Sequence, residues 1–118
     1  MAKKIKTIDY DEDNDIFFIS NDERIKASID IGDFILDVNH DNLISGIEIM
    51  DASENLGISK EILKNISSIK MSVNYKTNHV YVLLGILFKK GNKEINIPIP
   101  LTLNLGHKAP RKELLVSN

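Results

Sequence analysis

Apolar and polar residues alternate most regularly in the last part of the chain. Residues 69–76 and 93–105 show a period of two, which is typical of half-buried β-strands, and residues 79–90 between them are interpreted as a third strand with a continuous apolar run. Turns at Thr77-Asn78 and Gly91-Asn92 would join these strands into an antiparallel meander. Both turns place one apolar set on the same face, which we expect to pack on the rest of the protein: Ile69, Met71, Val73, Val82, Leu84, Ile86, Ile97, Ile99 and Leu101.

Two prolines lie in the last of these strands. In the register set by the two turns, the backbone nitrogens of Pro98 and Pro100 point away from the neighbouring strand, so the missing N–H groups remove no hydrogen bond. The pattern therefore predicts that this strand is an edge that is closed to further pairing.

The first half of the chain predicts shorter strands at residues 3–10, 15–20 and 25–31, and a hairpin formed by residues 34–39 and 43–50 across His40-Asp41. That hairpin puts Asp37 and Glu48 on one face together with Ile35, Ile44 and Met50. One helix is predicted after Ser59, a suitable N-cap, with apolar residues at helical spacing: Ile58, Ile62, Leu63, Ile66 and Ile69.

These elements predict an α+β fold that is mainly antiparallel β-sheet, with a C-terminal three-stranded meander and one short helix. Residues 1–105 are expected to form a single β-rich domain, and residues 106–118 are expected to be a flexible tail, because no periodic pattern follows Gly106.

Two segments carry a family resemblance. One is Tyr10-Asp11 followed by Asp15-Ile16-Phe17-Phe18-Ile19; the other is Phe34-Ile35-Leu36-Asp37 followed by Gly46-Ile47-Glu48-Ile49-Met50-Asp51-Ala52-Ser53. Over residues 8–53 the chain resembles the small prokaryotic family called domain of unknown function 2283. It departs from that family at Asn42, where glycine is usual. The resemblance implies no established activity. Some members of the family lie beside toxin-like proteins, which implies an antitoxin-like role in binding a partner.

Composition and charge narrow the classes of function. The chain of 118 residues has no cysteine, which excludes disulfides, thiolate metal sites and cysteine nucleophiles. Its longest apolar run is the nine residues 80–88, whereas a membrane helix needs about 20. No contact with a membrane is expected, and the expected location is the cytoplasm.

The charges are distributed unevenly along the chain. Residues 1–57 hold 5 basic and 14 acidic residues, which gives a net charge of −9, and residues 58–118 hold 10 basic and 3 acidic residues, which gives +7. The two oppositely charged halves could face each other within one domain.

Candidate chemistry is sparse. Asp9, Asp11, Asp13 and Asp15 alternate as in a calcium loop, but the glycine and the final glutamate of such a loop are missing. The histidines, His40, His79 and His107, are isolated, so neither a metal nor a cofactor is predicted.

One carboxylate stands inside an apolar strand. Glu48 is therefore a candidate buried carboxylate, which we expect to pair with a lysine of the basic half. Asp37, on the neighbouring strand, could join Glu48 in acid–base catalysis, and a small enzyme built on this pair is an alternative hypothesis.

The outer face of the meander is not uniformly polar. Tyr81, Leu83 and Leu87 run along its central strand beside Pro98 and Pro100. Three lysines surround them: Lys70, Lys76 and Lys89. An apolar centre with a charged rim is typical of an interaction surface, unless the helix or the tail of the same chain covers it. We therefore predict a non-catalytic protein-interaction or self-associating module. Nucleic-acid binding is not favoured, because the lysines are scattered.

Overall fold

The computed structural model describes residues 2–105, which form two antiparallel sheets and two short helices. The five-stranded sheet contains β2 (Thr7–Asp11), β3 (Ile16–Ser20), β4 (Ile25–Ile31), β5 (Phe34–Asn39) and β6 (Ile44–Ile49), in the order β2-β3-β6-β5-β4. The four-stranded sheet contains β1 (Lys3–Lys4), β7 (Ile66–Tyr75), β8 (His79–Lys90) and β9 (Lys93–Asn104), in the order β1-β7-β8-β9. Helices α1 (Ala52–Leu56) and α2 (Lys60–Lys64) connect β6 to β7. The predicted tail, residues 106–118, lies outside the described residues.

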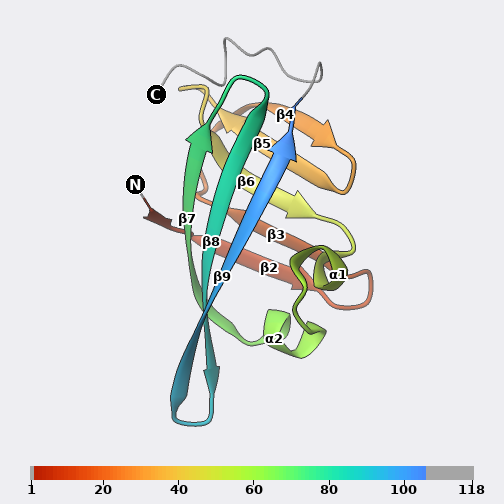
Figure 1. The fold of residues 1–118 in the computed structure, drawn as a ribbon, viewed down its shortest axis with the longest axis vertical. Coiled ribbons are helices and arrows are strands. Elements are labelled where there is room, and N and C mark those ends of the chain that lie inside the picture. The colour runs from red at the N-terminus through yellow and green to blue at the C-terminus, as the bar shows by residue number, and fades with distance from the viewer. Residues whose placement is uncertain (1, 106–118) are drawn as a thin grey trace.

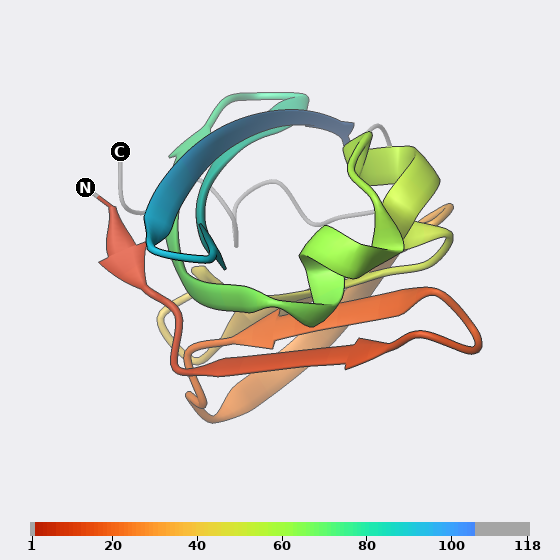
Figure 2. The same cartoon turned by 90° about the horizontal axis from the view of Figure 1, so that it is seen from below.

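The two sheets pack on each other with their strands crossing at a large angle (Figure 1). The four-stranded sheet curves over the five-stranded sheet, and both helices lie at one side of the space between them (Figure 2). This is the arrangement of a sandwich of crossed sheets with one core. Buried side chains come from both sheets and both helices, among them Phe17, Ile19, Leu36, Ile47, Ile49, Leu56, Leu63, Ile69, Leu84 and Ile86.

Strands β7, β8 and β9 pair in the register that the sequence predicts. Val73 lies opposite Val82, and Ile86 lies opposite Ile97. Gly91, with a φ of 62°, is the first of the two loop residues between β8 and β9, and glycine adopts this conformation without strain. The prediction of a mainly antiparallel β protein is confirmed.

The helical content differs from the prediction of one helix. Helix α2 begins after Ser59, whose hydroxyl accepts a hydrogen bond from the backbone N–H of Ile62 (3.2 Å), but it ends at Lys64. Ile66 and Ile69 belong to β7, because pairing with β8 extends back to Ile66 across a bulge. Helix α1 was not predicted. Both helices have five residues, far short of the length of about 20 that spans a bilayer.

The hairpin of β5 and β6 also differs from its predicted register. Residues 40–43 form its loop, which the backbone N–H of Asn39 closes by donating to the carbonyl of Leu43 (2.8 Å). A bulge follows, because Val38 pairs with Ile44 whereas Asp37 pairs with Gly46. The extra residue turns Ile44 into the core, so its predicted place on the outer face is wrong.

Candidate interaction surface

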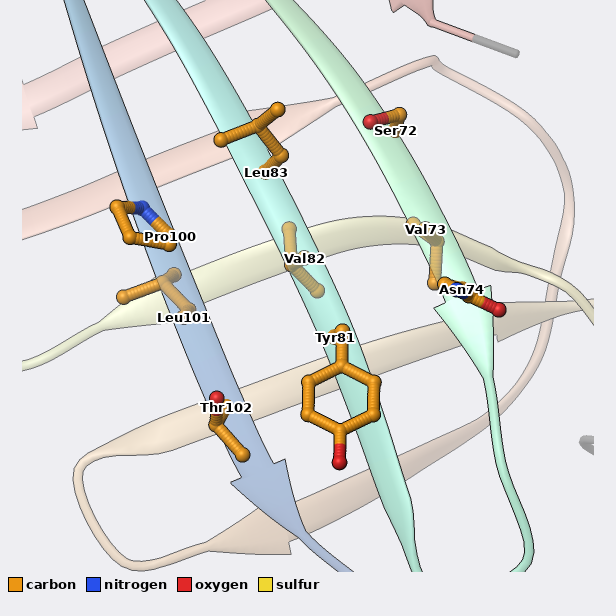
Figure 3. Close-up of a pocket in the computed structure, with 9 residues that line it drawn as sticks. All are labelled: Ser72, Val73, Asn74, Tyr81, Val82, Leu83, Pro100, Leu101 and Thr102. Carbon is orange, nitrogen blue, oxygen red and sulfur yellow. The ribbon is translucent and has the colours of Figure 1, made fainter.

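The outer face of the four-stranded sheet carries exposed apolar side chains on β8. Tyr81 and Leu83 are 41% and 47% exposed, while Val82 between them is buried. Tyr81 and Leu83 lie on the opposite side of the strand from Val82, as alternation along a strand requires (Figure 3). Leu87, further along β8 on the same face, is half-buried.

Residues of β9 and β7 flank this row. On β9, Pro100 lies opposite Leu83, and Pro98 lies opposite Gly85. On β7, Ser72 lies opposite Leu83. A shallow depression runs across the three strands, with Tyr81, Leu83, Pro100 and Thr102 in its lining (Figure 3). We call Tyr81, Leu83, Leu87, Pro98 and Pro100 the β8 face.

The surroundings of the β8 face are polar and partly basic. Lys70 lies on β7 opposite Gly85 and is exposed. Lys89 forms an ion pair with Glu94 (3.9 Å), but both side chains are more than half exposed, so the pair adds little stability. The rings of His79 and Tyr81 lie nearly parallel, with their centroids 6.2 Å apart.

The two helices leave the β8 face open. Leu56 of α1 and Leu63 of α2 are buried in the core between the sheets, on the other side of β8 from Tyr81 and Leu83. The alternative in which a helix covers this face is therefore wrong. The other alternative, in which the tail covers this face, concerns residues 106–118, which lie outside the described residues.

The two candidate catalytic carboxylates lie on the outer face of the five-stranded sheet, but not opposite each other. Asp37 faces Gly46, and Glu48 faces Ile35. The hydroxyl of Ser28 donates to Asp37 (2.8 Å). Glu48 is half-buried rather than buried, because it stands on a sheet surface beside Phe18, and within residues 2–105 it has no ion-pair partner.

Asp15 forms a hydrogen-bond network that the sequence did not reveal. Its carboxylate accepts from the hydroxyl of Tyr10 (2.6 Å), and from the hydroxyl (2.7 Å) and backbone N–H (3.1 Å) of Ser53. Its carbonyl accepts from the backbone N–H of Ala52 (2.9 Å). The network ties the turn between β2 and β3 to the start of α1.

This network shifts the pKa values of its two acids. Partial burial alone would raise the pKa of Asp15, but the hydrogen bonds from Tyr10 and Ser53 outweigh it and hold the pKa below its usual value. Burial and the adjacent Asp15 carboxylate raise the pKa of Tyr10. The signal in the sequence was a tyrosine and an aspartate on either side of the acidic turn, Tyr10 and Asp15, together with the distant Ala52-Ser53.

The remaining candidate ligands serve local structure. Asp11 accepts hydrogen bonds from the side chain (2.8 Å) and the backbone N–H (3.2 Å) of Asn14, which lower its pKa and fix the acidic turn. In the part of the chain that the structure describes, no three His, Cys, Asp or Glu residues gather as metal ligands would. His107 lies outside that part.

Comparison with known proteins finds a family match in the first half of the chain and one curated relative. Residues 7–53 match the family described as "Protein of unknown function (DUF2283)". A protein of Methanosarcina mazei named "Putative hypoxanthine phosphoribosyltransferase" is 34% identical over 89 residues, which cover 75% of this chain and 72% of that relative. The chain belongs to the DUF2283 family. No solved structure matches it.

Proposed function

We propose that this protein is a binding module that docks a partner protein on the β8 face. The observation that supports the proposal is the exposure of Tyr81 and Leu83, at 41% and 47%, at the centre of a rigid sheet. Tyrosine and leucine on a sheet lose little conformational freedom on binding, and an apolar patch with a polar rim is the usual anatomy of an interface. The exposed Lys70 beside the patch favours a partner with apolar anchors and acidic neighbours. An antitoxin-like role would be one instance of such binding.

The name of the Methanosarcina relative raises phosphoribosyl transfer as a second reading. Phosphorylated substrates are commonly held by the N-termini of helices and by basic side chains. Helices α1 and α2 have only five residues each, and the depression on the β8 face is lined by apolar, hydroxyl and amide side chains. These features favour binding of a protein over transfer of a phosphorylated sugar.

Site-specific photocrosslinking tests the proposal. A benzophenone amino acid placed at Leu83 and irradiated in source cells should give a discrete crosslinked product. The same amino acid at Glu61, which is exposed on α2, serves as the matched control. Equal crosslinking from both positions would contradict docking on the β8 face.

Self-association through the same face would give a different result. In that case the product from position 83 would be a crosslinked pair of this chain, and Leu83→Glu would make the protein monomeric in light scattering. A distinct partner would instead give a product of another mass. With the benzophenone amino acid moved to Tyr81, which is exposed on the same face, Leu83→Glu would abolish that product without changing the mass of the free protein.

A further inference from the structure

Strand β4 is an edge of the five-stranded sheet, and no strand of residues 2–105 pairs with its outer side (Figure 1). Five of its seven residues are exposed, and it contains no proline. Of the two edges of the four-stranded sheet, β9 carries Pro98 and Pro100, and β1 has two residues. Natural sheets usually protect a long edge, so a long edge without proline is a candidate for pairing with another strand.

The hairpin of β4 and β5 shows which backbone groups are unpaired. Its loop has two residues, and Gly32 (φ 62°) occupies the position that a type II′ turn gives to glycine. The pair that closes the loop, Ile31 and Phe34, exchanges hydrogen bonds, and so does every second pair after it. The N–H and C=O groups of Ser28 and Asp30 therefore point away from β5.

The sequence of β4 is complementary to itself when it is reversed. An antiparallel pair of β4 strands with a two-fold axis at Ser28 brings Lys26 of each chain opposite Asp30 of the other. The same register brings Ala27 opposite Ile29 of the second copy, and Ile25 opposite Ile31. Opposite charges facing each other across strands stabilise a pair, and like charges destabilise it. A two-fold axis makes both ion pairs form together.

Exposure agrees with this register. Ile25 is 39% exposed and Ala27 is exposed, although both lie in a strand whose Ile29 belongs to the core. A second β4 strand would cover part of both side chains. Lysine and a bulge are common devices that keep an edge from pairing, and β4 has both at Lys26. Here, however, the lysine has a carboxylate at the matching position, Asp30, so the charges favour a partner in this register. In one chain Lys26 donates to Asn42, a loop contact that would be exchanged for the ion pair.

We propose that β4 is a homodimerisation strand, which pairs antiparallel with β4 of a second copy about Ser28 and joins two five-stranded sheets into one. The dimer would carry two β8 faces, both on the sheets that take no part in the pairing. Dimerisation through β4 and docking on the β8 face are independent of each other.

Charge exchange tests the register. In light scattering of the full chain at concentrations between about 1 μM and 1 mM, the wild type should reach twice the mass of one chain. Lys26→Asp alone and Asp30→Lys alone should each be monomeric, because like charges then face each other. An equimolar mixture of these two variants should form a heterodimer, because a carboxylate then faces an ammonium group in both pairs, one of them the native pair and the other with its sign reversed. A mixture that stays monomeric would overturn the register, and a monomeric wild type would overturn the dimer.

Proline substitution tests the use of the edge itself. Ser28→Pro removes an N–H that points away from β5, so the folded chain should keep its circular dichroism spectrum and lose the dimer. Ser28→Val is the matched control, because it loses the same hydrogen bond to Asp37 but keeps the N–H, and it should stay dimeric. Amide exchange should show protection of Ser28 and Asp30 that rises with protein concentration. A wild-type dimer that Ser28→Pro leaves intact and Leu83→Glu dissociates would overturn the proposal.

Discussion

At the scale of single residues, the motif of this family has a structural role in the chain. Gly46 lies on β6 between its neighbours β3 and β5, where an added Cβ would stand 3.1 Å from the carbonyl oxygen of Ile19 and 3.2 Å from the Asp37 carboxylate. Asp15 links the first hairpin to α1 through Tyr10 and Ser53. Both residues hold segments together that lie far apart in the sequence.

Gly46→Ala should therefore destabilise the protein, by about 1–3 kcal/mol, because the added methyl group forces backbone and side chain apart in a tight contact. Gly85→Ala is the matched control in the other sheet, where the nearest atom to an added Cβ is the Lys70 carbonyl oxygen at 3.8 Å. It should change stability by less than about 1 kcal/mol, in the stabilising direction. Urea denaturation of both variants measures the free energy of unfolding. Equal losses of stability would show that the close contact at Gly46 does not determine the cost of the added methyl group.

Asp15 should make the stability of the protein sensitive to acid. Its pKa is lowered in the folded state from the ordinary 3.8, so its contribution is fully present above that value and is lost as the pH falls through the folded pKa. The raised pKa of Tyr10 has the opposite sense, because its contribution is present below 10.0 and is lost at higher pH. In thermal melts between pH 7 and pH 3, the melting temperature of Asp15→Asn should fall less than that of the wild type. If the melting temperatures of the two proteins fell equally with pH, Asp15 would not be the source of the acid sensitivity.

At the scale of elements, β9 shows how the sequence shapes an edge. Pro98 and Pro100 occupy the positions of β9 that do not bond to β8, so they cost the sheet no hydrogen bond and close its outer side. Beside β8 they also contribute apolar surface to the β8 face. The edge is thus protected against strand pairing, while its face is left available.

Replacing both prolines by threonine should open this edge. The double variant Pro98→Thr/Pro100→Thr should fold with a stability within about 1 kcal/mol of the wild type, because threonine fits a strand well. It should also associate more strongly with rising concentration, since two N–H groups become free to pair. Sedimentation velocity measures the change. Asn96→Thr, on the same face of β9, is the control, and it should sediment as the wild type does.

At the scale of the whole molecule, β8 separates the core from the proposed docking surface. Leu84 is fully buried between the two sheets, and its neighbour Leu83 is 47% exposed on the other side. Of these two adjacent leucines, Leu84 therefore packs in the core, and Leu83 is available for contact with a partner.

These two leucines should respond differently to the same change. Leu84→Ala should cost about 2–5 kcal/mol, because it leaves a cavity between the sheets. Leu83→Ala should cost less than about 1 kcal/mol, because it removes little buried surface. Chemical denaturation measures both values, and a large loss for Leu83→Ala would mean that the β8 face is covered within the chain.

The sequence by itself determined much of the four-stranded sheet. Its three long strands, their register, the turn at Gly91-Asn92 and the placement of Pro98 on an edge follow from period-two alternation and from turn chemistry, which are local properties. The N-cap at Ser59 is local for the same reason. The outward position of the side chains of the β8 face was also predictable, since the opposite face was already filled by apolar residues.

Tertiary structure decided the features that depend on contacts between distant segments. The bulge that turns Ile44 into the core, the extension of β7 to Ile66 and the formation of α1 arise because neighbouring strands and the Asp15 network compensate for weak local preferences. The crossing of the two sheets is set by side chains packing across them. Only the tertiary structure could show that Glu48 stands on an outer surface and that, within residues 2–105, β4 is an edge strand.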